Sequence, residues 1–272
     1  MVRNNLLDNA PIGVFDSGLG GLTVLNSLQK KLPGESFLYF GDTAHVPYGT
    51  RSRETVIRYS TEITRFLVEK RVKLIVIACN TASAIALESL QAMFPVPIIG
   101  VVEPIVEKAM MDYQSGAVGI IGTRATISSK AYYHAFKKRS STLEIVEKAC
   151  PLFVPIIEEG WGDTPVAQQV AEIYLSAFEG IQLDSLVLGC THYPMISGTL
   201  SRILPKSVRL LSSGEAVAEH VETFLDDHDL RGSGNHVYEN YFVTDFPQQF
   251  DSIGSRFLER DLPNIEQVNI FS

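Results

Sequence analysis

Cysteine is scarce in this sequence. Its 272 residues include three cysteines, Cys79, Cys150 and Cys190. A disulfide framework needs more cysteines than this, and an odd number of them in a reducing compartment indicates free thiols. The sequence therefore excludes a disulfide-stapled scaffold, and its thiols must serve a different role.

Long apolar runs are missing as well. No stretch of the chain approaches the roughly 20 consecutive apolar residues that a helix needs to span a bilayer. The amino terminus reads MVRNNLLDNAP, with Arg3 as its one basic residue, and does not resemble a secretory signal. We therefore expect a cytoplasmic protein that does not associate with membranes.

Basic residues are outnumbered. The sequence has 23 lysines and arginines against 31 aspartates and glutamates, a formal net charge of −8, and no basic run. This balance opposes a general attraction to the backbone of DNA or RNA, so we expect no nucleic-acid partner. The 45% hydrophobic and 20% charged content is typical of a globular protein with one large domain or two moderate ones.

Two apolar runs that each end in a cysteine organise the chain. Residues 74–84 read LIVIACNTASA, and residues 185–193 read SLVLGCTHY. Such short runs are typical of strands buried on both faces, and open α/β sheets bind their ligands at the carboxyl ends of these strands. We predict that Cys79 and Cys190 face one substrate from opposite sides and act as paired acid and base. The polar side chains that follow them are those of Asn80, Thr81, Thr191 and His192.

The two halves of the chain resemble each other. Residues 117–124, AVGIIGTR, repeat the opening pattern IGVFDSG of a strand followed by a small polar turn. The two cysteine motifs are separated along the chain by nearly the same number of residues as these two strand-and-turn patterns. An internal duplication of an α/β unit explains both similarities. The sequence therefore predicts two like halves packed over a shared cleft.

A carboxyl group ends the first predicted strand. Residues 11–21 read PIGVFDSGLGG and lead into the helical spacing of Leu22 and Leu25. The glycines suit an anion at a helix start, but their spacing does not match the dinucleotide fingerprint, which disfavours a nucleotide. Asp16 can instead hold an ammonium group.

The remaining elements follow from apolar periodicity and turn residues. We predict strands at residues 36–40, 95–100, 142–148, 208–211 and 265–270, with residues 236–244 as an edge strand. The predicted helices cover residues 52–71, 82–93, 101–111, 165–178, 194–204, 214–227 and 247–258. Residues 41–49 form a loop that can wall a pocket, and residues 226–235 form a flexible loop.

The thiols are compatible with several further roles. Cysteines also fill small apolar sites at strand ends, which is the role we prefer for Cys150. Zinc could use Cys79, Cys190 and His192, although no C-x-x-C is present. The same lack disfavours a redox disulfide, and a cysteine protease would leave the second cysteine without a role.

Five ordered motifs carry a family resemblance: FDSGLGGLTVL, YFGDTAHVPYGTRS, ACNTASA, VPIIEEG and LGCTHYP. Together they resemble the aspartate/glutamate racemase family, and within it the glutamate racemases, from about residue 11 to near residue 244. The resemblance implies a cofactor-independent isomerase that supplies D-glutamate for bacterial peptidoglycan and so for cell wall biogenesis and cell shape. It also implies two pseudo-symmetric flavodoxin-like α/β/α subdomains, residues 1–100 plus 213–272 and residues 101–212, with a cleft between them.

Racemisation suits the predicted pair of thiols. Removing the α-proton from one face and delivering another to the opposite face requires two bases, and no lysine lies in a clear Schiff-base context, so we expect neither a cofactor nor a metal. By resemblance, Cys79 deprotonates D-glutamate and Cys190 deprotonates L-glutamate. The implied catalytic set is Cys79, Cys190, His192, Asp16, Asp42 and Glu158. The implied substrate-binding set is Asp16, Ser17, Tyr48, Gly49, Asn80, Thr81, Thr191 and His192.

Three rival functions are compatible with this pattern. They are an aspartate racemase on the same fold, a non-catalytic amino-acid-binding or thiol-sensing protein, and a zinc hydrolase. The choice between glutamate and aspartate depends on the loop around Tyr48, whose shape the sequence does not reveal. The sequence does not fix the oligomeric state either, for which a homodimer is one option.

Overall fold

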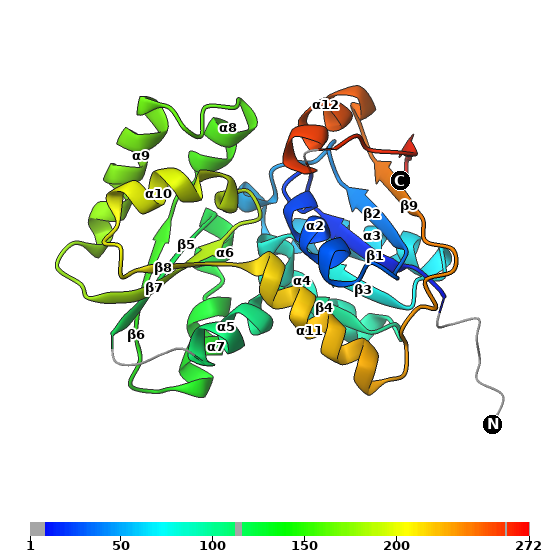
Figure 1. Cartoon of the computed structure of the whole chain (residues 1–272), viewed down its shortest axis with the longest axis horizontal. Helices are drawn as coiled ribbons and strands as arrows, with labels where there is room; N and C mark the ends of the chain where they lie inside the picture. Colours follow the sequence, from blue (N-terminus) through cyan, green and yellow to red (C-terminus); the bar gives the residue numbers. More distant parts are fainter. Residues whose placement is uncertain (1–8, 112–115, 259, 272) are drawn as a thin grey trace.

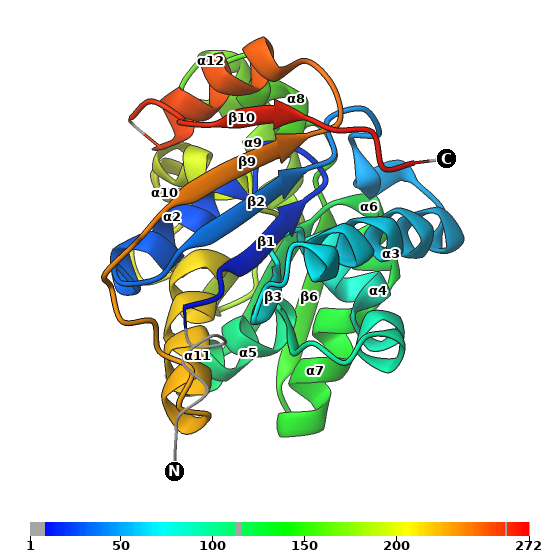
Figure 2. The same cartoon turned by 90° about the vertical axis from the view of Figure 1, so that its right-hand side faces the viewer.

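The computed structural model describes residues 9–111, 116–258 and 260–271. Two parallel sheets, covered by helices, lie side by side (Figure 1). The first sheet has the order β10-β9-β2-β1-β3-β4, and Figure 2 shows β10, β9, β2, β1 and β3 side by side. These strands are β1 (Ile12–Asp16), β2 (Phe37–Gly41), β3 (Leu74–Ile77), β4 (Ile98–Gly100), β9 (Glu239–Val243) and β10 (Ile265–Gln267). The second sheet, of order β6-β5-β7-β8, contains β5 (Ala117–Gly122), β6 (Glu144–Ala149), β7 (Leu183–Gly189) and β8 (Arg209–Ser212).

Helices connect these strands. The α-helices are α2 (Leu22–Lys31), α3 (Arg53–Glu69), α4 (Asn80–Met93), α5 (Val102–Met111), α6 (Arg124–Ser128), α7 (Ala131–Arg139), α8 (Phe153–Glu158), α9 (Pro165–Leu175), α10 (Ser197–Ile203), α11 (Ser213–Asp227) and α12 (Pro247–Leu258). Short 3-10 turns are η1 (Tyr48–Thr50), η2 (Ser176–Phe178) and η3 (Tyr193–Ile196). Among the described residues, no helix is both long and apolar enough to cross a bilayer.

The two sheets repeat one strand order. In the first, β2-β1-β3-β4 are neighbours, and in the second β6-β5-β7-β8 occupy the same places. Counted within each unit, both have the order 2-1-3-4 of flavodoxin-like sheets. The α/β fold with two pseudo-symmetric units is thereby confirmed, and β3 and β7, the strands that precede the two cysteines, are equivalent.

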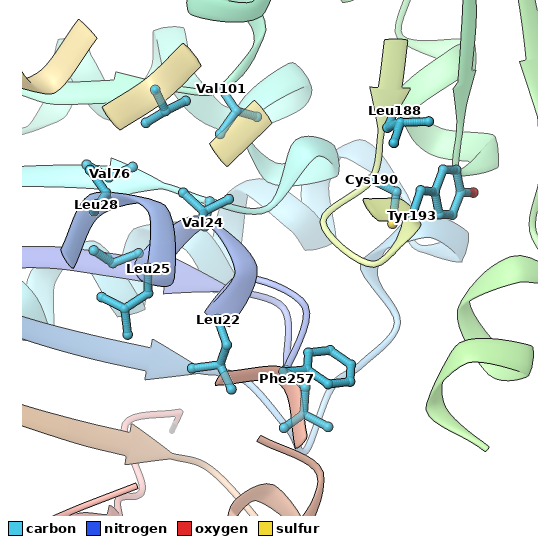
Figure 3. Close-up of a cluster of buried hydrophobic side chains, with 14 of the residues drawn as sticks. Leu22, Val24, Leu25, Leu28, Val76, Val101, Leu188, Cys190, Tyr193 and Phe257 are labelled. Atoms are coloured by element: carbon cyan, nitrogen blue, oxygen red, sulfur yellow. The ribbon is translucent and has the colours of Figure 1, made fainter. Parts of the chain in front are cut away.

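A shared apolar core lies between the units. Every residue of β1, β2, β3 and β5 is buried, as expected for strands covered on both faces. Helix α2 presents Leu22 and Leu25 to a core cluster that also contains Leu188 and Tyr193 of the second unit (Figure 3). Helix α11 packs on α2 and α5 and joins the end of the second sheet to the first unit.

Several elements differ from the sequence predictions. Strand β9 is not an edge strand, because it pairs with β2 on one side and with the short β10 on the other. Helices α6 and α7 were not predicted, since α7 buries only Tyr132, Ala135 and Phe136 beside three consecutive basic residues. The helix predicted at 82–93 begins two residues earlier, and the one at 194–204 is divided into η3 and α10.

Candidate active site

Cys79 lies where β3 turns into α4. The apolar strand ends at Ile77, and Cys79 takes an extended backbone conformation as the N-cap of the helix. Its sulfur accepts a hydrogen bond from the backbone amide of Ala82 at 3.5 Å, and its thiol donates to the Ser17 hydroxyl at 3.6 Å. The thiol is thus placed between the first turn of α4 and the loop after β1.

The Cys79 thiol is protonated at neutral pH. Burial raises its pKa to about 12, and the carboxylate of Asp16 adds to the increase because it disfavours a second negative charge nearby. The Ala82 amide and the Ser17 hydroxyl act in the opposite direction but do not outweigh these effects. Cys79 is therefore poised as a proton donor.

Cys190 follows the equivalent strand, β7, and has a different neighbour. Its sulfur lies 3.9 Å from Nδ1 of His192, whose Nε2 lies 2.9 Å from Oε1 of Glu158. Burial lowers the pKa of His192, but the hydrogen bonds with Cys190 and Glu158 outweigh it and raise that pKa to about 10. At neutral pH the imidazole is therefore cationic, and this cation lies beside the Cys190 sulfur.

Asp16 connects the two units. Its carboxylate is buried at the end of β1, where Oδ2 accepts from the Gly18 amide at 2.9 Å and Oδ1 accepts from the Thr191 hydroxyl at 3.4 Å. Burial raises its pKa, while the nearby charge of His192 and the backbone amides oppose the increase. The first strand of one unit thus meets the cysteine motif of the other.

Glycines permit this close approach at two places. A Cβ atom at Gly20 would overlap the side chains of Thr191 and His192, and one at Gly49 would lie 2.6 Å from Cβ of Thr123. Both glycines belong to the first unit, and all three neighbours belong to the second. Any larger residue at position 20 or 49 would therefore push the two units apart.

The first turn of α4 is bound where the two units meet. Nδ2 of Asn80 donates to the Tyr132 hydroxyl at 2.7 Å and to the Ser213 hydroxyl at 3.0 Å. Oγ1 of Thr81 lies 2.9 Å from the hydroxyl of Thr123. Sequence reasoning missed these partners: Tyr132, Ser213, Thr123 and Thr126. The repeat offered one signal, because Thr123 follows β5 as Ser17 follows β1, whereas nothing in the sequence marked the other three.

Asp42 and Tyr48 form a pair of their own. The Tyr48 hydroxyl donates to Oδ2 of Asp42 at 2.7 Å, while Oδ1 of Asp42 lies 2.8 Å from both His45 Nδ1 and Thr244 Oγ1. Tyr48 is 1% exposed. The structure therefore places Asp42 behind Tyr48, where it binds the hydroxyl. The carboxylate that binds His192 is that of Glu158, whereas the neighbouring Glu159 is exposed.

A small cleft opens beside this site. Its volume is about 130 Å³, and it lies between the loops after β1 and β2, the end of α8, and α12. Its lining includes Gly18, Val46, Glu158, Phe246 and Phe250.

All three cysteines are buried and free. In the part of the chain that the structure describes, no three His, Cys, Asp or Glu residues are grouped closely enough to hold a metal ion.

The repeated sheet and the buried polar site between its two copies define an α/β racemase. A model of the family described as Asp/Glu/Hydantoin racemase matches residues 12–221, most of the chain. The chain belongs to this family and is an amino-acid racemase.

Its relatives include named glutamate racemases. That of Geobacter metallireducens is 49% identical over 263 residues, which cover 95% of this chain and 96% of the relative. That of Chlorobaculum parvum is 44% identical over 272 residues, 99% of this chain and 100% of the relative. A crystal structure of glutamate racemase from Francisella tularensis in complex with D-glutamate has a TM-score of 0.92 and 38% identity, and the match covers 97% of this chain and 99% of that one.

Proposed function

We propose that this racemase interconverts L- and D-glutamate with two thiols and no cofactor. The observation that carries the proposal is the placement of Cys79 and Cys190 after equivalent strands, both buried at the contact between the units. The relatives named glutamate racemase support the choice of substrate. We further propose that the product serves peptidoglycan synthesis in the cytoplasm.

The unlike neighbours of the two cysteines suit one direction of the reaction. When L-glutamate is bound, the thiolate of Cys190, beside the His192 imidazolium, takes the α-proton from one face of the substrate. The Cys79 thiol then delivers its proton to the opposite face of the carbanion. This leaves D-glutamate, a Cys79 thiolate and a Cys190 thiol, and the reverse reaction begins from these states.

The polar side chains around the thiols would bind glutamate and offset the charge that develops on its α-carboxylate. Asp16 and Ser17 hold the α-ammonium group in this proposal, and Tyr48 and Gly49 hold the side-chain carboxylate. The α-carboxylate is bound by Thr81, Thr191 and the backbone amide of Asn80, because the side-chain Nδ2 of Asn80 already donates to Tyr132 and Ser213. Fixed donors in a buried site stabilise such a charge far better than water does, which an enzyme without an electron-accepting cofactor needs.

The two units act as subdomains in this proposal. The strands of the first sheet lie within residues 12–100 and 239–267, and those of the second within 117–212. This supports subdomains of residues 1–100 plus 213–272 and residues 101–212. Because the site residues come from both and are buried, glutamate enters when the subdomains separate and reacts when they close.

Circular dichroism of the two amino acids tests the proposal. L-glutamate incubated with the protein alone should lose its optical activity, whereas L-aspartate should keep it. In deuterium oxide the product should carry deuterium at the α-carbon, because thiol protons exchange with solvent. Turnover of aspartate only would overturn the substrate assignment. A fully protonated product, or a rate abolished by a metal chelator, would overturn the two-thiol mechanism.

A further inference from the structure

Tyr132 is a buried side chain between the two thiol motifs that has no part in the mechanism above. It belongs to α7 of the second unit and is fully buried. Its hydroxyl accepts the 2.7 Å hydrogen bond from Asn80, the residue directly after Cys79. The hydroxyl of Ser213, at the start of α11, binds both Asn80 and Tyr132.

The ring of Tyr132 lies against the other motif. A Cβ atom at Gly189, the residue directly before Cys190, would lie 3.3 Å from Cε2 of Tyr132. One aromatic side chain therefore contacts the neighbour of each cysteine, with a hydroxyl at one end and a ring edge at the other. Burial raises the pKa of Tyr132, while the hydrogen bonds with Asn80 and Ser213 oppose the increase, and both cysteines lie near enough to this hydroxyl to influence its pKa.

The contact also fixes the amide of Asn80. Nδ2 is held by two hydroxyl groups, while Oδ1 is buried with no hydrogen-bond partner among the described residues. A buried carbonyl oxygen without a partner is uncommon, and in a site for an amino acid it can accept from the substrate. The orientation of this oxygen depends on Tyr132 and Ser213.

We propose that Tyr132 is a positioning residue, which sets the spacing between the two thiol-bearing strand ends and so the distances over which the two protons move. This role rests on the proposed two-thiol function. Racemisation needs both sulfur atoms close to one α-carbon, and a misplacement of about 1 Å in a catalytic group can reduce a rate by about 10²-fold. A rigid ring between the motifs prevents that displacement.

Two variants separate the hydroxyl from the ring. Tyr132→Phe keeps the ring and should reduce kcat/KM by about 10-fold, since the hydroxyl that binds Asn80 and Ser213 is lost. Tyr132→Leu removes the ring as well and should reduce kcat/KM by about 10²-fold. In both variants the isotope effect of α-deuterated glutamate should increase, because longer proton transfers limit the rate more strongly. Tyr174→Phe is the matched control, since its hydroxyl binds the Leu152 amide away from the site.

The outcomes distinguish the two proposals. A wild-type protein that fails to racemise glutamate with α-deuterium uptake would remove the proposed function itself. A normal wild type whose Tyr132→Phe variant has unchanged kcat/KM and isotope effect would overturn only the positioning role. Activity that falls merely with the folded fraction, measured by thermal unfolding, at an unchanged isotope effect would overturn it too. The Tyr132→Phe variant decides the matter even where Tyr132→Leu does not fold.

Discussion

At the scale of single residues, equivalent positions have acquired unlike surroundings. Cys79 lies at a helix start beside a carboxylate and is held as a thiol, whereas Cys190 lies beside an imidazolium. Both cysteines follow equivalent strands, but an α-helix begins directly after Cys79 and a 3-10 turn follows Cys190, and the neighbouring side chains differ as well. Each thiol therefore has its own part in the proposed reaction.

Replacing each cysteine separately should reveal those parts. Cys79→Ala and Cys190→Ala should each reduce racemisation by about 10² to 10⁴-fold, the usual contribution of a general acid or base. In deuterium oxide, Cys79→Ala should still introduce deuterium into L-glutamate without inversion, and Cys190→Ala into D-glutamate, as NMR would show. Cys150→Ala, a buried change outside the site, is the control. Retained racemisation in either site variant would contradict the assignment.

His192 should make stability depend on pH. Its folded-state pKa of about 10 lies above the ordinary value, so the folded protein keeps a proton that the unfolded chain loses above about pH 6.5. The contribution of His192 to the free energy of unfolding is thus complete below that pH and is lost as the pH rises towards 10. The loss is on the order of a few kcal/mol. Denaturant unfolding of wild type and His192→Gln across this range should show the slope only in wild type. His236→Gln, at an exposed position, should keep the slope.

At the scale of elements, apolar pattern predicted what lies inside. The buried strands around both cysteines and the bounds of α12 agree with the sequence predictions because their apolar periodicity is strong. Helix α7 was missed because its buried face is short. Strand β9 was wrongly predicted as an edge strand, because its pairing with β10 is a long-range contact that the alternation of apolar and polar residues does not encode.

The candidate site divides in the same way. The thiols, Asp16 and His192 follow strand ends and could be predicted from the sequence. Tyr132 and Ser213 could not, because both contacts depend on the tertiary fold: Tyr132 reaches Asn80 from the other unit, and Ser213 reaches it from the start of α11. The bond between Tyr48 and Asp42 depends likewise on the fold of their loop.

The turn η1 should tolerate no side chain at its centre. Gly49→Ala would place a methyl group against Thr123 and force the units apart, an overpacking cost of about 1–3 kcal/mol. We expect kcat/KM for glutamate to fall by about 10-fold in steady-state assays. Gly198→Ala in α10 is the matched control, since the nearest atom to its new Cβ is 3.9 Å away, and it should leave kcat/KM unchanged. Equal kcat/KM in the two variants would show that the units do not meet at Gly49.

At the scale of the whole molecule, a buried ion pair anchors the chain where it returns to the first unit. Nζ of Lys73 lies 2.6 Å from Oε2 of Glu35 and donates to the carbonyl of Leu230, while Oε1 of Glu35 accepts from the Gly232 amide. Both charged side chains are nearly inaccessible to solvent. The segment that follows α11 is thereby fixed to the first sheet.

Breaking this pair should destabilise the entire chain. Lys73→Met leaves the Glu35 carboxylate buried without its cation, which should lower the free energy of unfolding by about 3–5 kcal/mol. Because one core cluster includes residues of both units, denaturant unfolding should stay a single transition. Lys73→Met/Glu35→Leu should recover much of the loss. Two separate transitions, or a midpoint equal to that of wild type, would contradict this account.

The unlike surroundings of Cys79 and Cys190 cannot make the protein favour one enantiomer at equilibrium. Mirror-image amino acids have equal free energies in water, so the ratio of the two specificity constants is fixed at unity however unequal the two sides of the crevice are. The inequality can emerge only in turnover number and half-saturating concentration, which must shift by the same factor from one enantiomer to the other. The handedness of this molecule thus governs how readily each form fills it, while the final mixture stays evenly divided.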